Sequence, residues 1–577
     1  MSDFSNAEFE SKGSRMQRFK HAFSSLSAFH QAIILESSTS ILVNEDLLPS
    51  PPETDLDNLE LLCLLVCTLN LDLKRDVLTS HYRWSESWLV STWSVGSSMI
   101  ALGATIRDAL LVVLFANILS AVVICFNGRA ASRYHVGYPV LSRVTFEIYG
   151  SYLVVVLRAI LGIIWHNFED SAYSVSSVVY SCISKGSSSQ FVFDASSHHG
   201  RRSQTRSQLR HLFTLKSIIL PLAGLGLVIW ATTANDGVSS SNLIDSSAKT
   251  STSVFAWGII SQFNSVMGAN SALLVTVPDL ARYSKTKNAQ LYGQALGLPL
   301  STLCAAFGII TTSAVKNMYG EAYWNPYDLF NGILGEGYTS KARAGVFFAS
   351  ASFAFATLGT SIACNITPFA ADVTCLAPRY INIIRGQLLC LVISFAIVPW
   401  KIVVTANRFL NFLGGYSIFQ GPVVAVMIVD YFIIRKGNMS IKDMYSLSRE
   451  GRYFYMKGVN LRAFPAFVVG FLMPLPSFVA SFGYEIGVVA SHIYALGWVL
   501  SFAMGCLSYW IICIVFKVPG DDKEYIWEGK VDESQVAIVE GVPAVGDNMI
   551  EEVADKEKVS VMELLRVFEY RVEVMFE

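Results

Sequence analysis

A polar segment interrupts a long apolar stretch at residues 354–378, AFATLGTSIACNITPFAADVTCLAP. Asn365 and Asp372 lie seven residues apart, so a helix would place them on one face. An ionisable group at the centre of a bilayer costs about 2.5–3.5 kcal/mol and therefore faces a cavity or a partner. The segment predicts one wall of a substrate path, or else Asn365 only forms hydrogen bonds between helices. Three further residues share another face at spacings i, i+3 and i+4: Ala356, Gly359 and Thr360.

An aromatic and an acidic residue, Trp165 and Glu169, are spaced i and i+4 and so share a helix face. An indole can stack a flat heterocycle, with a gain of about 1–3 kcal/mol per base in nucleic-acid binders. A carboxylate one turn away can accept hydrogen bonds from ring N–H groups or carry a proton. The alternatives are that Trp165 packs at the membrane interface and that Glu169 caps its helix. Arg158, earlier in the same run, is expected to pair with a carboxylate inside the bundle.

A third group lies in FLNFLGGYSIFQGP, residues 409–422, where Leu413 and Tyr416 are spaced i and i+3. The glycine pair between them permits a flexible gate or a close helix contact, although core packing is an alternative for Leu413. Asp279 and Asp430 close their helices near basic loops and are interpreted as structural. The chain carries no Ser/His/Asp set, phosphate loop, HExxH motif or Cys/His ligand spacing, which argues against an enzyme and against a metal site.

The composition defines the class of protein. The 577 residues are 52% hydrophobic and 15% charged, with a mean hydropathy of +0.44. Soluble domains carry about 25% charged residues, so this chain is predicted to be a polytopic membrane protein. A formal net charge of −2 argues against nucleic acid as a partner.

Eleven apolar runs approach or reach the length of about 20 residues that a helix needs to cross a bilayer. Residues 1–56 and 518–577 are polar and are expected to be cytoplasmic tails. Residues 57–87 form an atypical segment before a transporter domain at 88–517. The candidate spans are Trp88–Thr105, Asp108–Cys125, Tyr149–Phe168, Phe213–Thr232, Val254–Val277, Gly293–Val315, Gly345–Ile366, Gly386–Val404, Phe409–Ile434, Ala463–Phe482 and Ala490–Phe516.

Basic loops follow even-numbered spans of a twelve-span scheme and are therefore predicted to be cytoplasmic. They include Arg129 with Arg133, and the run Arg435–Lys457. The basic, Ser-rich run Arg201–Arg210, read as part of a linker, should be cytoplasmic too, but only three clear spans precede it. A further crossing is thus required between residues 170 and 201, where the sequence is poorly suited to one.

Glycine and proline punctuate two of the spans. Gly96 and its serine neighbours fall in the first span, and Gly268 and Pro278 bracket the sixth. Paired interruptions in corresponding spans of two five-helix halves predict unwound helices around a binding site at the midplane. The alternative is that glycine is simply frequent in membrane helices.

Taken together, these pieces resemble the nucleobase–cation symporters of family one, and among them the fungal Fur-type permeases. The resemblance covers most of Asn44–Trp510. It implies an all-α polytopic membrane protein with the LeuT-like five-plus-five inverted repeat, two extra C-terminal helices and about 11–12 spans. The motifs that carry it include NEDLLPSPPE, STWSVGSSMIALG, LRAILGIIW, PDLARYSK, FLNFLGGYS and the specific block at 358–387, LGTSIACNITPFAADVTCLAPRYINIIRGQ.

The resemblance also implies roles for four substrate-binding candidates. Trp165 matches the family's stacking tryptophan, and Asn365 matches the amide that hydrogen-bonds the ring. Glu169 stands where the family usually has Gln, and Asn270 stands where an aromatic that sandwiches the ring is common.

Further positions match gating, coupling and ion-site residues of the family. The ion-site-like residues fall where sodium-coupled members hold their ion: Ala356, Gly359 and Thr360. Gly359 lacks the hydroxyl found there in sodium users, which favours a coupled proton. The gating or proton-coupling candidates are Asp372, Leu413 and Tyr416, with Asn44 and Asp46 from a motif in the N-terminal tail.

The implied activity is import of a small heterocycle across the plasma membrane by alternating access, with a coupled proton and no cofactor. The implied class is uracil, uridine, allantoin, thiamine or nicotinamide riboside. The start of helix one departs from the family, and the Ser/Arg-rich linker stands in place of helix four. A transport-incompetent paralogue or membrane sensor is therefore the alternative. The identity of the heterocycle, proton against sodium coupling, and the oligomeric state stay open.

Overall fold

The computed structural model describes residues 42, 45–49, 87–169, 206–234, 252–284, 287–397, 406–449, 451–480, 487–518 and 527–528. All of them belong to one unit, Met1–Val531; a second unit, Asp532–Glu577, contains none of them. Helices are the only regular secondary structure within these ranges.

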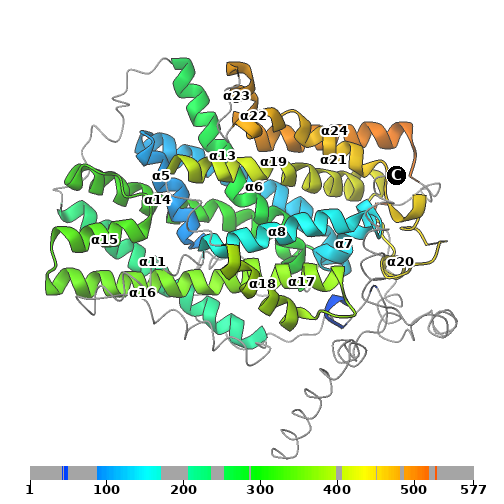
Figure 1. The fold of residues 1–577 in the computed structure, drawn as a ribbon, viewed down its shortest axis with the longest axis horizontal. Helices are drawn as coiled ribbons and strands as arrows, with labels where there is room; N and C mark the ends of the chain where they lie inside the picture. The colour runs from blue at the N-terminus through cyan, green and yellow to red at the C-terminus, as the bar shows by residue number, and fades with distance from the viewer. Residues whose placement is uncertain are drawn as a thin grey trace, which may run out of the picture. The chain divides into compact units, whose positions relative to one another are not determined.

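Figure 1 shows the described helices, coloured from blue to red in chain order. In order they are η1 (Glu45–Leu47), α5 (Val90–Ala101), α6 (Ile106–Tyr134), α7 (Tyr138–Phe146), α8 (Ser151–Glu169), α11 (Arg206–Ala234), α13 (Thr252–Ala281), α14 (Ala289–Tyr319), α15 (Pro326–Glu336), α16 (Ser340–Thr360), η3 (Ser361–Ile366), α17 (Thr367–Leu376), α18 (Ile383–Ile397), α19 (Ala406–Val429), η5 (Asp430–Ile434), α20 (Ile441–Met444), η6 (Met456–Gly458), α21 (Ala463–Leu472), α22 (Leu475–Ala480), α23 (Val488–Ala495) and α24 (Gly497–Val515).

Membrane-spanning length is met by six of the described helical segments: Ile106–Tyr134, Leu215–Ala234, Gly293–Tyr319, Ser340–Leu376, Arg408–Ile434 and Gly497–Val515. Each of the eleven predicted spans overlaps described helix, and six of them overlap one of these long segments. Several boundaries differ from prediction: α5 has only 12 residues, α6 continues to Tyr134, and α11 begins at Arg206, within the run predicted to be a linker. The crossing required between residues 170 and 201, and most of the segment 57–87, lie outside the described residues.

Helix α13 packs against both α6 and α19. Helix α6 lies along α13 and α14, while α19 lies along α13 and α24. The run α16–η3–α17 packs on α8, α11 and α18. An aromatic cluster ties α5 to α15 and α16, because the Phe353 ring lies edge-on to both Trp93 (5.5 Å) and Phe330 (5.7 Å). Edge-to-face packing of buried rings adds about 0.5–1.5 kcal/mol per pair beyond the burial itself.

The predicted unwinding at Gly96 and Gly268 is wrong. Both glycines lie inside continuous α-helices, and α13 continues past Pro278 to Ala281. They serve close helix contacts instead: a Cβ at Gly96 would lie 2.9 Å from the Ala305 carbonyl oxygen, and one at Gly268 would collide with the Leu413 carbonyl. The irregular helix turns are the π-helical segments η3 and η5, since an extra residue in the turn shifts the hydrogen-bond ladder locally.

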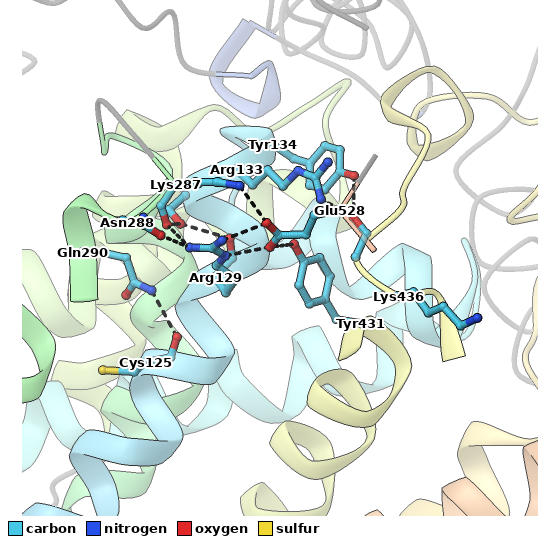
Figure 2. Close-up of polar contacts among 12 residues, drawn as sticks. Cys125, Arg129, Arg133, Tyr134, Lys287, Asn288, Gln290, Tyr431, Lys436 and Glu528 are labelled. Atoms are coloured by element: carbon cyan, nitrogen blue, oxygen red, sulfur yellow. Dashed lines mark hydrogen bonds and ion pairs between the residues drawn. The ribbon is translucent and has the colours of Figure 1, made fainter. Parts of the chain in front are cut away.

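A short C-terminal segment, Trp527–Glu528, binds the basic ends of three helices (Figure 2). The Glu528 carboxylate accepts two hydrogen bonds of 2.8 Å from the Arg129 guanidinium at the end of α6, and one of 3.0 Å from Lys287 before α14. The Glu528 backbone N–H donates to the Lys436 carbonyl at 2.9 Å, beyond η5. These cations hold the pKa of Glu528 at about 2, below its usual 4.5.

We expect Glu528→Gln to loosen this contact. The Glu528 side chain is only 4% exposed. The loss of its charge should cost about 1 kcal/mol, which raises the fraction of molecules with this segment detached roughly fivefold. Tryptic cleavage at Lys523 and Lys530 of the purified full-length protein should accelerate by that factor. Because the pKa of Glu528 is lowered on folding, the contribution is present above pH 4.5 and is lost as the pH falls towards 2. Glu336→Gln, at an exposed carboxylate ending α15, is the control; equal cleavage rates for all three proteins contradict the prediction.

Candidate substrate-binding site

A small cavity lies among α5, α6, α8, α13, α14 and the α16–η3 junction. It has a volume of about 100 Å³, below the ~300–1,000 Å³ of sites for drug-sized ligands. Four of the sequence-predicted residues line it together: Trp165, Asn270, Thr360 and Asn365. The structure therefore brings the predicted indole and carboxamide to one cavity within the helix bundle.

Two hydrogen bonds fix the orientation of Trp165, which is 5% exposed. The indole N–H donates to the Tyr416 hydroxyl at 3.1 Å, and that hydroxyl donates to the Gly268 carbonyl at 2.5 Å. The two rings are edge to face, with centroids 6.2 Å apart. Since Tyr416 already accepts the indole N–H, stacking on the ring face is the interaction that Trp165 offers to a flat ligand.

The placement of Asn365 depends on a close approach of two helices. A Cβ at Gly162 of α8 would lie 3.3 Å from the backbone carbonyl oxygen of Asn365 and 3.3 Å from the Phe369 Cβ. Glycine at this crossing lets α8 run against η3, and Trp165 follows Gly162 on the same face, three residues later. The spacing within LRAILGIIW thus brings the indole beside the π-helical segment that carries Asn365.

The predicted ion-site-like residues are buried, and a lysine reaches them. Thr360 donates its hydroxyl to the Ala356 carbonyl at 3.0 Å and accepts a hydrogen bond from the Lys216 ammonium of α11. Lys216 is completely buried. On the next residue, the Ser361 hydroxyl lies 2.5 Å from Nδ1 of His166. Lys216 was not among the predicted site residues, although a lone lysine in the apolar run FTLKSIILP was a visible signal.

Asp372 lies away from the cavity, in a cluster of buried charges. The Arg158 guanidinium donates through Nε to Asp372 at 2.8 Å, through Nη2 to the second Asp372 oxygen, and through Nη1 to Asp279 at 2.5 Å. It also lies over the Tyr138 ring, 4.1 Å from the centroid. The prediction that Arg158 pairs with a carboxylate inside the bundle is confirmed.

The other predicted residues are placed as follows. Leu413 is fully buried, and neither it nor Tyr416 lines the cavity. Asp46 accepts a hydrogen bond of 3.1 Å from the backbone N–H of Ile383, at the start of α18. Asn44 and the side chain of Glu169 lie outside the described residues, so their predicted roles stay predictions.

Among the cavity residues that were not anticipated are Asn117 of α6 and Ser301 of α14. Asn117 is 2% exposed, and it is the single amide in the apolar run ALLVVLFANILSAVV. A polar residue at the middle of a span was a signal of the same kind as Asn365, but its partners Ser301 and Asn270 lie 184 and 153 positions away in the sequence.

A bundle of membrane helices around a small cavity with polar groups on its walls is the architecture of a transporter of small molecules. The family model described as permease for cytosine/purines, uracil, thiamine and allantoin matches residues 83–501, and the chain belongs to this family. Family members are transporters, and the prediction that the chain is not an enzyme is confirmed.

The chain is similar to several yeast permeases. It is 30% identical to the allantoin permease of Saccharomyces cerevisiae over 471 residues, which is 76% of this chain and 73% of that protein. It is 30% identical to the uridine permease of the same yeast, covering 76% and 72%, and 27% identical to its thiamine transporter, covering 76% and 77%.

The fold is similar to that of Mhp1, a nucleobase-cation-symport-1 family transporter. The structure of Mhp1 in a closed conformation with bromovinylhydantoin bound matches with a TM-score of 0.61 and 17% identity, covering 87% of this chain and 99% of Mhp1. An inward-facing structure of Mhp1 matches with the same TM-score. The LeuT-like helical fold expected from the sequence is thereby confirmed.

Proposed function

We propose that this protein imports a small nucleobase, nucleoside or related heterocyclic vitamin across the plasma membrane by alternating access. The observation that carries the proposal is that Trp165, Asn270 and Asn365 line one small cavity inside the bundle. Trp165 stacks the ring, while the two amides hydrogen-bond its polar edge. The yeast relatives named above support the heterocycle class.

Uptake of radiolabelled uracil, uridine, allantoin and thiamine tests this function in a yeast strain that lacks its own permeases. We expect uptake of at least one of them, and we expect Trp165→Ala to reduce it about 5- to 100-fold through the lost stacking energy. Trp510→Ala is the matched control, because Trp510 is 44% exposed on α24 and does not line the cavity. No uptake of any compound by protein at the cell surface contradicts the proposal and supports a transport-incompetent paralogue or sensor.

The coupling ion is proposed to be a proton. The Lys216 ammonium already bonds Thr360 at the ion-site-like position, and a sodium ion held there would be repelled by the like charge. Gly359, moreover, has no hydroxyl to offer a metal ion. In the same uptake assay, a protonophore should abolish accumulation, whereas replacing sodium by choline should leave it unchanged. Loss of uptake in choline medium overturns proton coupling without touching the proposed substrate class.

A further inference from the structure

A network of hydrogen-bonded amides and hydroxyls joins α14, α6 and α13 along the cavity wall. The Asn117 amide nitrogen lies 3.0 Å from the Ser301 hydroxyl and 3.1 Å from the Thr302 hydroxyl. The Asn270 amide nitrogen lies 2.9 Å from the Asn117 carbonyl oxygen and 3.0 Å from the Ser120 hydroxyl. Asn117, Asn270 and Ser301 all line the cavity.

The hydroxyl groups of Ser301 and Ser120, at the ends of this network, determine the orientation of the side-chain amides of Asn117 and Asn270. An amide oxygen and nitrogen have nearly the same shape, so their positions follow from the groups they face. Ser301 donates its one hydrogen to the Leu298 carbonyl at 2.5 Å and can therefore only accept from Asn117. The NH₂ group of Asn117 must then face Ser301, and its carbonyl oxygen must face Asn270.

The orientation of the Asn270 side-chain amide is fixed in the same way. Its NH₂ group has to donate to the Asn117 oxygen, and also to Ser120, whose own hydrogen is directed to the Met267 sulfur at 3.4 Å. The side-chain carbonyl oxygen of Asn270 has no hydrogen-bond partner among the described residues. It is the acceptor that this wall offers to a molecule in the cavity.

We infer that Asn117 and Ser301 are positioning residues, which lock Asn270 as a hydrogen-bond acceptor and thereby select substrates with a ring N–H at that edge. The inference rests on the proposed function and narrows its substrate class to cyclic amides and ureides with a free N–H. An N-methyl group at this edge leaves the Asn270 oxygen desolvated and unpaired, which should weaken binding about 10- to 100-fold.

Competition by N-methylated rings tests the inference. Uptake of radiolabelled uracil, or of allantoin if uracil is not taken up, is measured for the full chain in the permease-deficient strain. Unlabelled uracil, 1-methyluracil and 3-methyluracil serve as competitors. We expect at least one methyl isomer to compete about 10- to 100-fold more weakly than uracil. The ratio of the inhibition constants of the methyl isomer and uracil measures this selectivity. In Asn117→Leu the ratio should fall towards one, because the Asn270 side-chain amide is free to rotate.

A matched control separates selectivity from folding. Asn127, on the same helix, is also buried and donates to the Leu274 carbonyl of α13 at 2.6 Å, but it does not line the cavity. Asn127→Leu should lower expression while keeping the ratio. Ser301→Ala, which removes only the hydroxyl that fixes the Asn117 amide, should lower the ratio even if Asn117→Leu does not fold.

Three results overturn the inference. Equal competition by uracil and both methyl isomers in the unmodified chain refutes it while the proposed function stands. An unchanged ratio in every foldable variant of Asn117 and Ser301 does the same. Absence of uptake of all heterocycles defeats the proposed function first, and the inference falls with it.

Discussion

Replacing Arg158 by Leu should prevent most of the protein from reaching the cell surface. Arg158 is 4% exposed and Asp372 is completely buried, and the guanidinium neutralises Asp372 while also bonding Asp279. Without it, the completely buried Asp372 carboxylate would lose the cation that pairs with both of its oxygens. Breaking a buried ion pair by removing one partner costs about 3–5 kcal/mol, a large fraction of the about 5–15 kcal/mol by which a typical domain is stable.

Graded substitutions show whether charge or geometry carries this effect. Arg158→Lys keeps the charge but loses the fork that grips both Asp372 oxygens, so its cost should be intermediate. Asp372→Asn leaves Arg158 paired with Asp279 and should be the mildest. Fluorescence-detected size-exclusion chromatography and thermal melting in detergent measure the series, with exposed Arg107→Leu as the control. An Arg158→Leu protein that folds as well as the Arg107 control refutes the account.

The same series bears on the proposed roles of Asp372. If Asp372 acts only through Arg158, Asp372→Asn protein that folds should keep its protonophore sensitivity and its substrate accumulation. If Asp372 carries the coupled proton, the folded variant should lose accumulation against a gradient while still exchanging substrate. The bidentate pairing with Arg158 supports the first outcome.

The order of the helices was predictable because apolar runs of spanning length have few other structures available in a bilayer. The meeting of Trp165 and Asn365 was predictable only through the family resemblance, since nothing local links residues 200 positions apart. The partner type of Arg158 followed from physics alone, because a buried guanidinium requires a carboxylate or carbonyl nearby. Which of the available carboxylates it chooses depended on the packing of α8, α13 and α17.

The predictions at Gly96 and Gly268 failed because glycine serves two structural purposes in membrane helices. Gly96 and Gly268 looked like points of unwinding, yet each is the place where another helix backbone comes closest. Asn117 and Lys216 were not singled out in the sequence, and only the structure shows that they bond Asn270 and Thr360. The contact of Glu528 with Arg129 joins residues almost 400 positions apart, and a short acidic tail carries no signal for it.

Gly268→Ala should be the most damaging single-methyl change in α13. The added Cβ would collide with the carbonyl oxygen of Leu413, so α13 and α19 would have to separate. Overpacking of this kind typically costs about 1–3 kcal/mol. Gly258 lies on the same helix, and no atom of the described residues lies within 4 Å of its would-be Cβ. Gly258→Ala should therefore be neutral or stabilising by up to about 1 kcal/mol, because alanine favours helix.

The consequence for transport follows from the hydrogen bonds at the same crossing. The Gly268 carbonyl accepts from Tyr416, which in turn accepts from the Trp165 indole, so separating the helices also releases the stacking ring. Tyr416→Phe breaks both bonds without adding an atom at the crossing. We therefore expect Tyr416→Phe to reduce uptake at near-normal surface expression, whereas Gly268→Ala reduces expression and uptake together. If Gly268→Ala and Gly258→Ala melt at the same temperature, the close crossing of α13 and α19 is not what positions Trp165.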